Sequence, residues 1–186
     1  MYIEPLQRHI HVCAQIELPQ YSARDPGFWN VISIREPFRP RPNPDKFLQF
    51  HTMICYDLMG VEGLDEDELL HAPKVEQMAE IFRFVDELPG QPILVHCWAG
   101  RSRSAAVALV VIVRAMHLEN LGEEETVSRS CEALLAIRPL AAPNPVILGQ
   151  GLSLFLDPES AKRMTGLLLN HPVIFGNHHS GASPSV

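Results

Sequence analysis

The sequence lacks an apolar run long enough to cross a membrane. Its longest such run, Ala105 to Val113, falls far short of the roughly 20 residues that a transmembrane helix needs. The opening stretch, MYIEPLQRHIHV, also lacks the extended apolar segment of a signal peptide. We therefore expect a protein without a membrane span that works in the cytoplasm.

Basic residues are in the minority. The 186 residues include 15 Lys and Arg against 22 Asp and Glu, which gives a formal net charge of −7. This charge argues against nucleic acid or anionic lipid as the main partner. An anionic substrate would have to be attracted by a local positive pocket rather than by the whole surface.

No CxxC pair and no zinc-finger spacing occurs among the four cysteines, which are Cys13, Cys55, Cys97 and Cys131. A chain of this length can build its core without disulfides, and 46% apolar residues with 20% charged residues is typical of a soluble globular protein. We expect a single domain over residues 1–170 and a disordered tail over residues 171–186.

Apolar periodicity predicts strands that alternate with helices. Runs rich in β-branched residues predict strands over 9–16, 29–35 and 47–56, and a short apolar run predicts a strand buried on both faces over 92–97. Helical spacing predicts helices over 75–88, 104–117, 123–137, 145–156 and 158–169. The proline-rich stretch 36–46 and the acidic stretch 60–68 are expected to be loops. We therefore predict an α/β fold with a central, mostly parallel sheet flanked by helices.

One nine-residue stretch joins the predicted buried strand to the apolar helix after it: His96-Cys97-Trp98-Ala99-Gly100-Arg101-Ser102-Arg103-Ser104. A loop that opens a helix points several backbone N–H groups at one place, and the helix dipole adds partial positive charge there. Gly100 permits the tight curl of such a loop, and Arg103 has a rigid fork that can hold two phosphate oxygens. The stretch therefore predicts an anion-binding site.

Cys97 comes at the base of this predicted nest. The N–H groups that bind an anion also stabilise a thiolate, so cysteines in such places ionise more readily than free ones. Cys97 would then be ready to attack phosphorus. A cysteine considered alone is more often an inert core residue, but these neighbours favour a nucleophile.

The stretch matches the pattern HCxxGxxRS at all five fixed positions, and the sequence thereby resembles the cysteine-dependent protein tyrosine phosphatase superfamily, including its dual-specificity branch. The strand FHTMICYD, which ends in an aspartate, and the later pairs Arg138-Pro139 and Pro143-Asn144 are also similar to that family. The resemblance extends over residues 8–157. It implies the fold of this family and a phosphomonoester hydrolase that forms a phosphocysteine intermediate. It implies no metal and no other cofactor.

The resemblance also implies a role for each residue of the signature. Cys97 is the nucleophile. The phosphate is held by the Arg103 side chain and by backbone N–H groups of Trp98, Ala99, Gly100, Arg101, Ser102 and Arg103. Ser104 stabilises the leaving thiolate, caps the helix, or does both. His96 orients the cysteine, with a buried core histidine as a nearly equal alternative.

Several side chains leave alternatives open. Trp98 either packs or forms part of the pocket's floor or rim. Arg101 either adds a second cation for a more highly charged substrate, or points to solvent or an acidic neighbour. Arg39 and Arg41 either guide a phosphorylated substrate or belong to a solvated basic loop. Cys55 either traps the oxidised nucleophile in a disulfide or is an inert buried thiol.

The general acid is the least decided assignment. The spacing typical of the family favours Asp65 or Asp67, which lie 32 and 30 positions before Cys97, over Asp57, which lies 40 positions before it. Local structure favours Asp57, because it directly follows the strand predicted over 47–56. Asp65 and Asp67 belong to an acidic cluster typical of a solvated surface or a helix entry. We therefore predict Asp57 as the acid.

Three functions compete. A hydrolase of phosphotyrosine or dual-specificity protein substrates is favoured, with phosphoinositides and small phosphate esters as alternative substrates. A non-catalytic phosphate-binding module is less favoured, because every loop residue that the chemistry needs is present. A rhodanese-like sulfurtransferase is disfavoured by the HC and RS pairs that flank the loop and by the downstream Pro-Asn turn.

Overall fold

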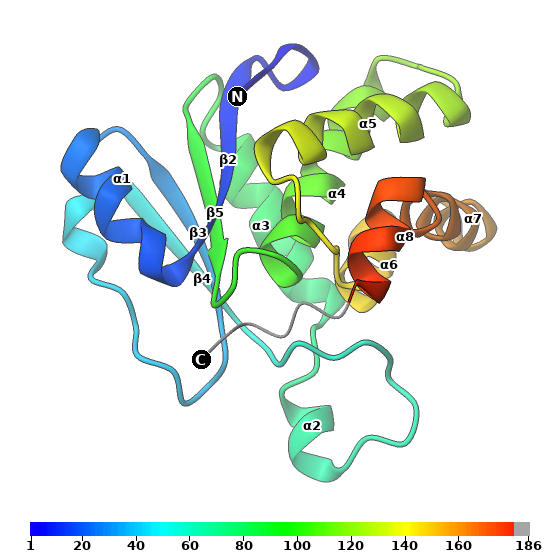
Figure 1. Ribbon diagram of the computed structural model, residues 1–186, viewed down its shortest axis with the longest axis horizontal. Helices are drawn as coiled ribbons and strands as arrows, with labels where there is room; N and C mark the ends of the chain where they lie inside the picture. The colour runs from blue at the N-terminus through cyan, green and yellow to red at the C-terminus, as the bar shows by residue number, and fades with distance from the viewer. Residues whose placement is uncertain (181–186) are drawn as a thin grey trace.

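The computed structural model describes residues 1–180, and a five-stranded sheet in the order β1-β2-β5-β3-β4 runs through them (Figure 1). The strands are β1 (Tyr2–Ile3), β2 (Arg8–Ala14), β3 (Asn30–Arg35), β4 (Gln49–Ile54) and β5 (Ile93–Cys97). β2, β5, β3 and β4 are parallel, and β1 is an antiparallel edge strand. The central strand β5 is buried along its whole length, so its last residue, Cys97, lies in the middle of the sheet's carboxyl edge.

The helices cover the two faces of the sheet unequally. They are α1 (Leu18–Arg24), α2 (Glu66–Leu70), α3 (Val75–Asp86), α4 (Arg103–Leu118), α5 (Glu123–Ile137), α6 (Pro145–Leu152), α7 (Pro158–Leu169) and α8 (Pro172–His179). α1 lies on one face, and α3 and α4 lie on the other with α5, α6 and α7 behind them (Figure 1). The larger part of the hydrophobic core is on this second face.

α4 is the best buried helix of this layer. Every residue from Arg103 to Val113 is buried, because the helix packs against β2 and β5 on one side and against α5 and α6 on the other. Gly151 of α6 comes so close that a Cβ there would lie 2.6 Å from Val110 Cγ1. This packing fixes the start of α4, and with it the loop that leads from β5.

The α/β prediction is confirmed, and each predicted strand and helix overlaps an observed one. None of the described helices is long and apolar enough to span a membrane. The single domain over residues 1–170 stays a prediction.

Three differences from the sequence prediction concern short elements. α1 was not predicted, because seven residues are too few for a helical period to show. The predicted acidic loop 60–68 is wrong at its end, where Asp65 caps the amino end of α2. The disordered tail is wrong over 172–179, because α8 forms there and buries Ile174 and Asn177. The rest of that prediction, 181–186, lies outside the described residues.

Candidate active site

The loop 98–102 joins β5 to α4 at the carboxyl edge of the sheet. Gly100 has a φ of +65°, and a Cβ on it would lie 2.4 Å from the backbone nitrogen of Ala14. Only glycine fits this position, where the loop curls against the end of β2. The N–H of Gln15 donates to the Trp98 carbonyl at 3.1 Å and ties the loop to the same strand end.

The turn after α5 holds the loop from the other side. The Ala142 N–H donates to the Arg101 carbonyl at 2.9 Å, and the Asn144 N–H donates to the Ser102 carbonyl at 3.3 Å. The Arg138 guanidinium donates to the Ala99 carbonyl at 3.2 Å.

These bonds orient the peptide groups of the loop. Four carbonyls accept hydrogen bonds from outside it, and in a planar trans peptide the following N–H points the opposite way. The N–H groups turned inward are those of Ala99, Gly100, Ser102 and Arg103. Together with the amino end of α4 they form a site suited to an anion.

Cys97 lies at the base of this site. The residue is 1% exposed, and its Sγ is 3.1 Å from the Ser104 hydroxyl oxygen. Ser102, not Ser104, occupies the N-cap position of α4, so the capping alternative for Ser104 is wrong. The Ser104 hydroxyl is instead directed at the cysteine sulfur, where it can donate to a thiolate.

Arg103 is buried at 2% exposure and is held from two strand ends. Its Nη1 donates to the Cys55 carbonyl at 3.0 Å, and its Nη2 donates to Glu36 Oε1 at 3.1 Å. Its Nε lies 3.5 Å from Asp57 Oδ2. The guanidinium is therefore fixed in place before any phosphate arrives.

Glu36 was missed by the sequence analysis. Its position directly after β3, at the carboxyl edge of the sheet, was the available signal. Burial acts to raise the pKa of Glu36, but the hydrogen bond from Arg39 and the charge of Arg103 outweigh burial and lower that pKa. Glu36 is thus a charged partner for both arginines at neutral pH.

Of the three candidate acids, Asp57 is the one in contact with the loop. Its Oδ1 accepts from the Ser102 hydroxyl at 2.6 Å and from Asn144 Nδ2 at 2.8 Å. Asn144 thereby links Asp57 to the amino end of α6, which the Asn144 side chain also caps. Asp65 caps α2, and Asp67 accepts from the Tyr56 hydroxyl at 2.7 Å. Both are engaged away from the loop.

The His96 ring is fully buried, and neither ring nitrogen has a partner among the described residues. Neighbouring residues of a strand point to opposite faces, so the ring faces away from the Cys97 side and lies 6.4 Å from the Phe50 ring. Burial lowers the pKa of His96 to about 4, so the ring is neutral at pH 7. The orienting role predicted for His96 stays a prediction.

Arg101 makes contact with the C-terminal helix. Its guanidinium donates to the Asn177 carbonyl of α8. The Asn177 side-chain amide donates to the carbonyls of Pro139 and Ala141, both at 2.9 Å. Arg101 is therefore bound to α8. Through Arg101 and Asn177, α8 is connected both to the loop 98–102 and to the turn that supports this loop.

The remaining cysteines are buried thiols. Burial raises the pKa of Cys55 and of Cys131 to about 12, and it raises the pKa of Cys13 further. All three are protonated at neutral pH, which is the state of an inert core thiol. Among the described residues, no group of three or more His, Cys, Asp or Glu side chains is arranged to hold a metal.

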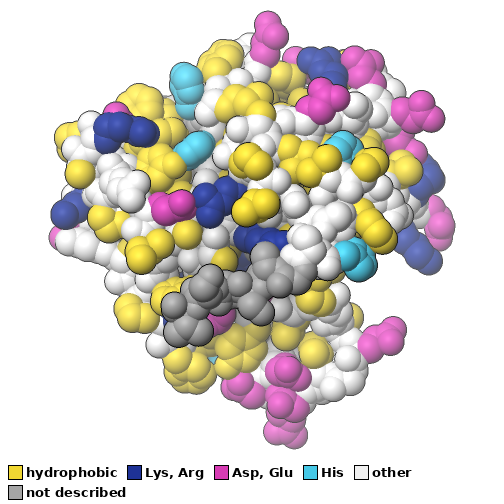
Figure 2. Space-filling model, viewed as in Figure 1, with side chains coloured by type: hydrophobic (Ala, Val, Ile, Leu, Met, Phe, Trp, Pro, Cys, Tyr) yellow, Lys and Arg dark blue, Asp and Glu magenta, His cyan; other side chains and the backbone are white. Residues whose placement is uncertain are grey.

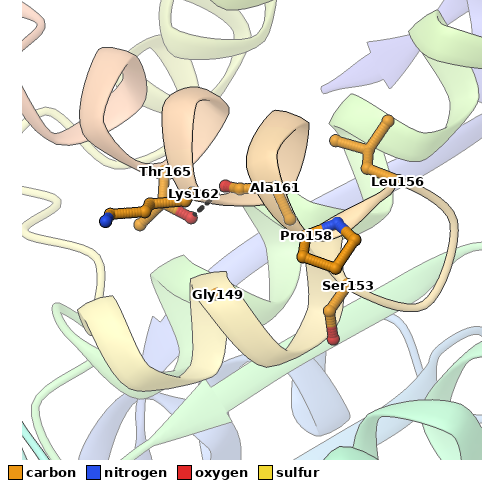
Figure 3. A pocket seen from close by; sticks show the side chains of 7 residues that line it. All are labelled: Gly149, Ser153, Leu156, Pro158, Ala161, Lys162 and Thr165. Carbon is orange, nitrogen blue, oxygen red and sulfur yellow. Dashed lines mark hydrogen bonds between the residues drawn. The ribbon is translucent and has the colours of Figure 1, made fainter.

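A hollow lies between α6 and α7, and none of its lining residues belongs to the loop 98–102 (Figure 3). It has a volume of about 440 Å³ and is lined by Gly149, Ser153, Leu156, Pro158, Ala161, Lys162 and Thr165. Lys162 is the one charged side chain in this lining, so no pair of acid and base meets there.

Curated proteins and solved structures resemble the chain, although no protein-family model matches it. Dual specificity protein phosphatase 15 of Mus musculus is 34% identical over 118 residues, which are 62% of this chain and 41% of that protein. The same protein of Rattus norvegicus is equally similar. The chain thus matches less than half of the length of these relatives.

The similarity of the fold covers most of the chain. The crystal structure of DUSP15 has a TM-score of 0.54 at 21% identity, and covers 92% of this chain and 95% of its own. PTPMT1 in complex with PI(5)P has a TM-score of 0.54 at 18% identity, with 89% and 96% covered. Human DUSP28 has a TM-score of 0.50 at 20% identity, with 83% and 94% covered. Part of the chain is therefore similar in sequence to a dual specificity protein phosphatase, and its fold is similar to those of DUSP15, PTPMT1 and DUSP28, in keeping with the resemblance that the signature indicates.

Proposed function

We propose that this chain hydrolyses phosphate monoesters on proteins, phosphotyrosine first among them, through a phosphocysteine intermediate. The observation that supports the proposal is the convergence of Cys97, Arg103 and the inward N–H groups at one anion site. Phosphoryl transfer has a loose transition state, so positioning and charge stabilisation supply most of the rate. A site held rigid by its own backbone bonds is suited to that task.

In the first step, the Cys97 thiolate attacks phosphorus while the bond between phosphorus and the ester oxygen breaks. Asp57 in its protonated form gives a proton to the departing oxygen. Arg103 and the N–H groups hold the three other phosphate oxygens as charge redistributes among them.

In the second step, Asp57 takes a proton from water as the water oxygen bonds to phosphorus. The bond between sulfur and phosphorus breaks, and the electron pair returns to Cys97 as a thiolate. The Ser104 hydroxyl, 3.1 Å from Sγ, donates a hydrogen bond to that leaving thiolate. Inorganic phosphate then leaves, and the site is restored without a metal or other cofactor.

Ser102 and Asn144 position the acid in this scheme. Both donate to the same oxygen of Asp57, and Arg103 lies near the other oxygen. The three contacts keep the carboxyl group over the loop, where a leaving oxygen would emerge. The side chains of Ser102 and Asn144 thus act through Asp57 rather than on the substrate.

Release of inorganic phosphate tests the proposal. Wild-type protein should release phosphate from p-nitrophenyl phosphate and from a phosphotyrosine peptide, and a Cys97→Ser variant should not. Binding of the peptide without release by wild-type protein would favour the phosphate-binding module instead. Release from a phosphoinositide but not from the peptide would favour the lipid alternative.

A further inference from the structure

The proline-rich loop brings Arg39 to the mouth of the site and holds it there. The guanidinium carbon lies 4.1 Å from the centre of the Trp98 ring, and Nε donates to Glu36 Oε2 at 2.9 Å. The backbone is also tied, because the Arg39 carbonyl accepts from Arg35 Nη1 at 2.9 Å. An exposed arginine ordinarily samples many rotamers, and binding a ligand must then fix one of them. Arg39 is already fixed from two sides.

A single carboxylate connects Arg39 to the centre of the site. Glu36 Oε1 accepts from Arg103, and Glu36 Oε2 accepts from Arg39. One carboxylate and two hydrogen bonds therefore separate the two guanidinium groups. A group attached close to a phosphate on Arg103 comes within reach of Arg39.

The Arg39 side chain remains 43% exposed, so solvent reaches it beyond its bond to Glu36. A guanidinium stacked on a ring keeps its N–H groups along its edge, and five N–H donors are available in that plane. This arrangement matches the two oxygens of a carboxylate. One side of the group is anchored, and another can receive an anion.

We propose that Arg39 is a specificity-determining residue, which binds the carboxylate of an acidic side chain next to the phosphorylated residue of a peptide substrate. This inference rests on the proposed function, because it takes a phosphopeptide as the occupant of the site. Trp98, which is 45% exposed, forms the platform beneath Arg39 and part of the rim. Phe38, which is 84% exposed beside Arg39, offers apolar surface to the rest of the peptide.

The surroundings of the mouth favour a peptide over an anionic membrane. Phe38 of the loop packs at 6.5 Å from the ring of His71, and His71 directly follows α2. The sequence over 65–68 is Asp-Glu-Asp-Glu, and acidic side chains gather over α2 in Figure 2. A bilayer is broad and negatively charged and would meet these carboxylates, whereas a short peptide can contact Arg39 and Phe38 without covering the carboxylates.

Arg41 provides a matched control. It belongs to the same loop, is also exposed, and lies 5.9 Å from the ring of Phe50 rather than on Trp98. Replacing either arginine by glutamine removes one positive charge from the loop. A difference between the two variants therefore reports position and not net charge.

The experiment measures the binding of two phosphotyrosine peptides to protein that carries Cys97→Ser. One peptide has aspartate on both sides of the phosphotyrosine, and the other has asparagine there. We expect the acidic peptide to bind roughly three- to tenfold more tightly, since the contact is charge-assisted but partly exposed. Arg39→Gln should abolish this preference, Arg41→Gln should keep it, and added salt should reduce it.

Several outcomes would overturn the inference. Equal binding of both peptides, or no binding of either, removes the preference itself. Equal weakening of both by Arg39→Gln would show that Arg39 acts only through Glu36 and Arg103. The same loss in Arg41→Gln would show a general charge effect. An effect confined to vesicles that contain a phosphoinositide would assign the anion to a lipid headgroup.

The test is independent of turnover. Phosphate release from p-nitrophenyl phosphate, measured on wild-type protein with Cys97 intact, tests the hydrolase alone. Preferential binding of the acidic peptide without phosphate release would refute the proposed hydrolase activity and support the role of Arg39. Phosphate release without preferential binding would support the hydrolase activity and refute the role of Arg39.

Discussion

Arg103 and Arg39 share one carboxylate, yet the two regions that present them differ in construction. Arg103 begins a helix that is buried along most of its length, and its guanidinium has partners at the ends of β3 and β4. Arg39 lies in an exposed loop with four prolines, where an indole ring and a single carboxylate hold it. The buried junction is suited to chemistry that tolerates little movement. The exposed loop is suited to discrimination between substrates, because small differences in binding free energy are enough for that. Substitutions in the first region should therefore act on rate by orders of magnitude, and substitutions in the second on affinity by small factors.

The largest effect should come from Cys97→Ser. A serine hydroxyl is not ionised in the nest, so attack on phosphorus fails and phosphate release should fall by about 10⁴-fold or more. Phosphopeptide binding should persist, because the inward N–H groups remain. Phosphate release and peptide binding, measured on the same preparation, check both parts. Residual turnover within tenfold of wild type would show that the buried junction does not supply the nucleophile.

Asp57→Asn comes next. It should lower turnover of a phosphotyrosine peptide by roughly 10²–10⁴-fold, the usual contribution of a positioned acid, and should matter less for the good leaving group of p-nitrophenyl phosphate. Rates on the two substrates across pH 5 to 8 measure this. Asp65→Asn is a close control, since asparagine also caps helices well. A large loss in Asp65→Asn or Asp67→Asn with a neutral Asp57→Asn would refute the assignment.

Arg103→Lys should be nearly as damaging as Arg103→Ala, with turnover lower by about 10²–10³-fold in each. Lysine keeps the charge but not the planar fork, and it cannot serve Glu36, the Cys55 carbonyl and a phosphate together. Steady-state rates for both variants, with thermal unfolding to verify the fold, make the comparison. Near-normal rates in the lysine variant would mean that charge alone matters in the buried region.

Asn177→Ala tests whether α8 belongs with the rigid region. Loss of its two bonds to the supporting turn should release the contact of α8 with Arg101. The KM for p-nitrophenyl phosphate should then rise by about three- to tenfold with little change in kcat. In an Arg101→Ala background the same change should have almost no further effect, because the two act as one unit. Additive losses, or an equal loss in the exposed control Val173→Ala, would make α8 a support for stability only.

The last effect is on stability rather than on catalysis and concerns His96. The pKa of His96 is about 4 in the folded protein against an ordinary value of 6.5, so the unfolded chain binds this proton more readily. Above pH 6.5 the ring is neutral in both states and His96 does not lower the free energy of unfolding. As the pH falls from 6.5 toward 4, the unfolded chain binds the proton first, and the free energy of unfolding falls by up to about 1.4 kcal/mol per pH unit. Urea unfolding at pH 7 and pH 5 measures it. The His96→Gln variant should show a weaker pH dependence than wild type, whereas the exposed control His117→Gln should not. Equal pH dependence in all three proteins would contradict the prediction.

The sequence predicts the buried junction well because its chemistry is local. Nine residues contain the end of the strand, the cysteine, the glycine and the arginine. The apolar helix that follows them indicates that the junction is buried. The residues that the sequence analysis missed make contacts between distant segments. Glu36 lies 67 positions from Arg103, and Asn177 lies 76 positions from Arg101, so no spacing rule joins them.

Local patterns differed in how much they predicted. α8 has no apolar stripe to mark it, since PVIFGNHH mixes apolar and polar residues around the helix, and its docking depends on the turn that it meets. The prediction of Asp57 depended on the end of the strand predicted over 47–56, whereas family spacing alone favours Asp65 or Asp67. The structure adds what periodicity does not contain, namely the partners that each side chain finds across the fold.

The inward N–H groups of the loop have a thermodynamic consequence. Several donors and the positive end of α4 converge on one point, and an anion there satisfies them only while the chain is folded. We therefore expect phosphate or sulfate in a buffer to act as a folding ligand, which at a concentration 100 times its dissociation constant would add about 2.7 kcal/mol to the free energy of unfolding. A melting temperature of this protein is a property of the protein and its buffer anion together.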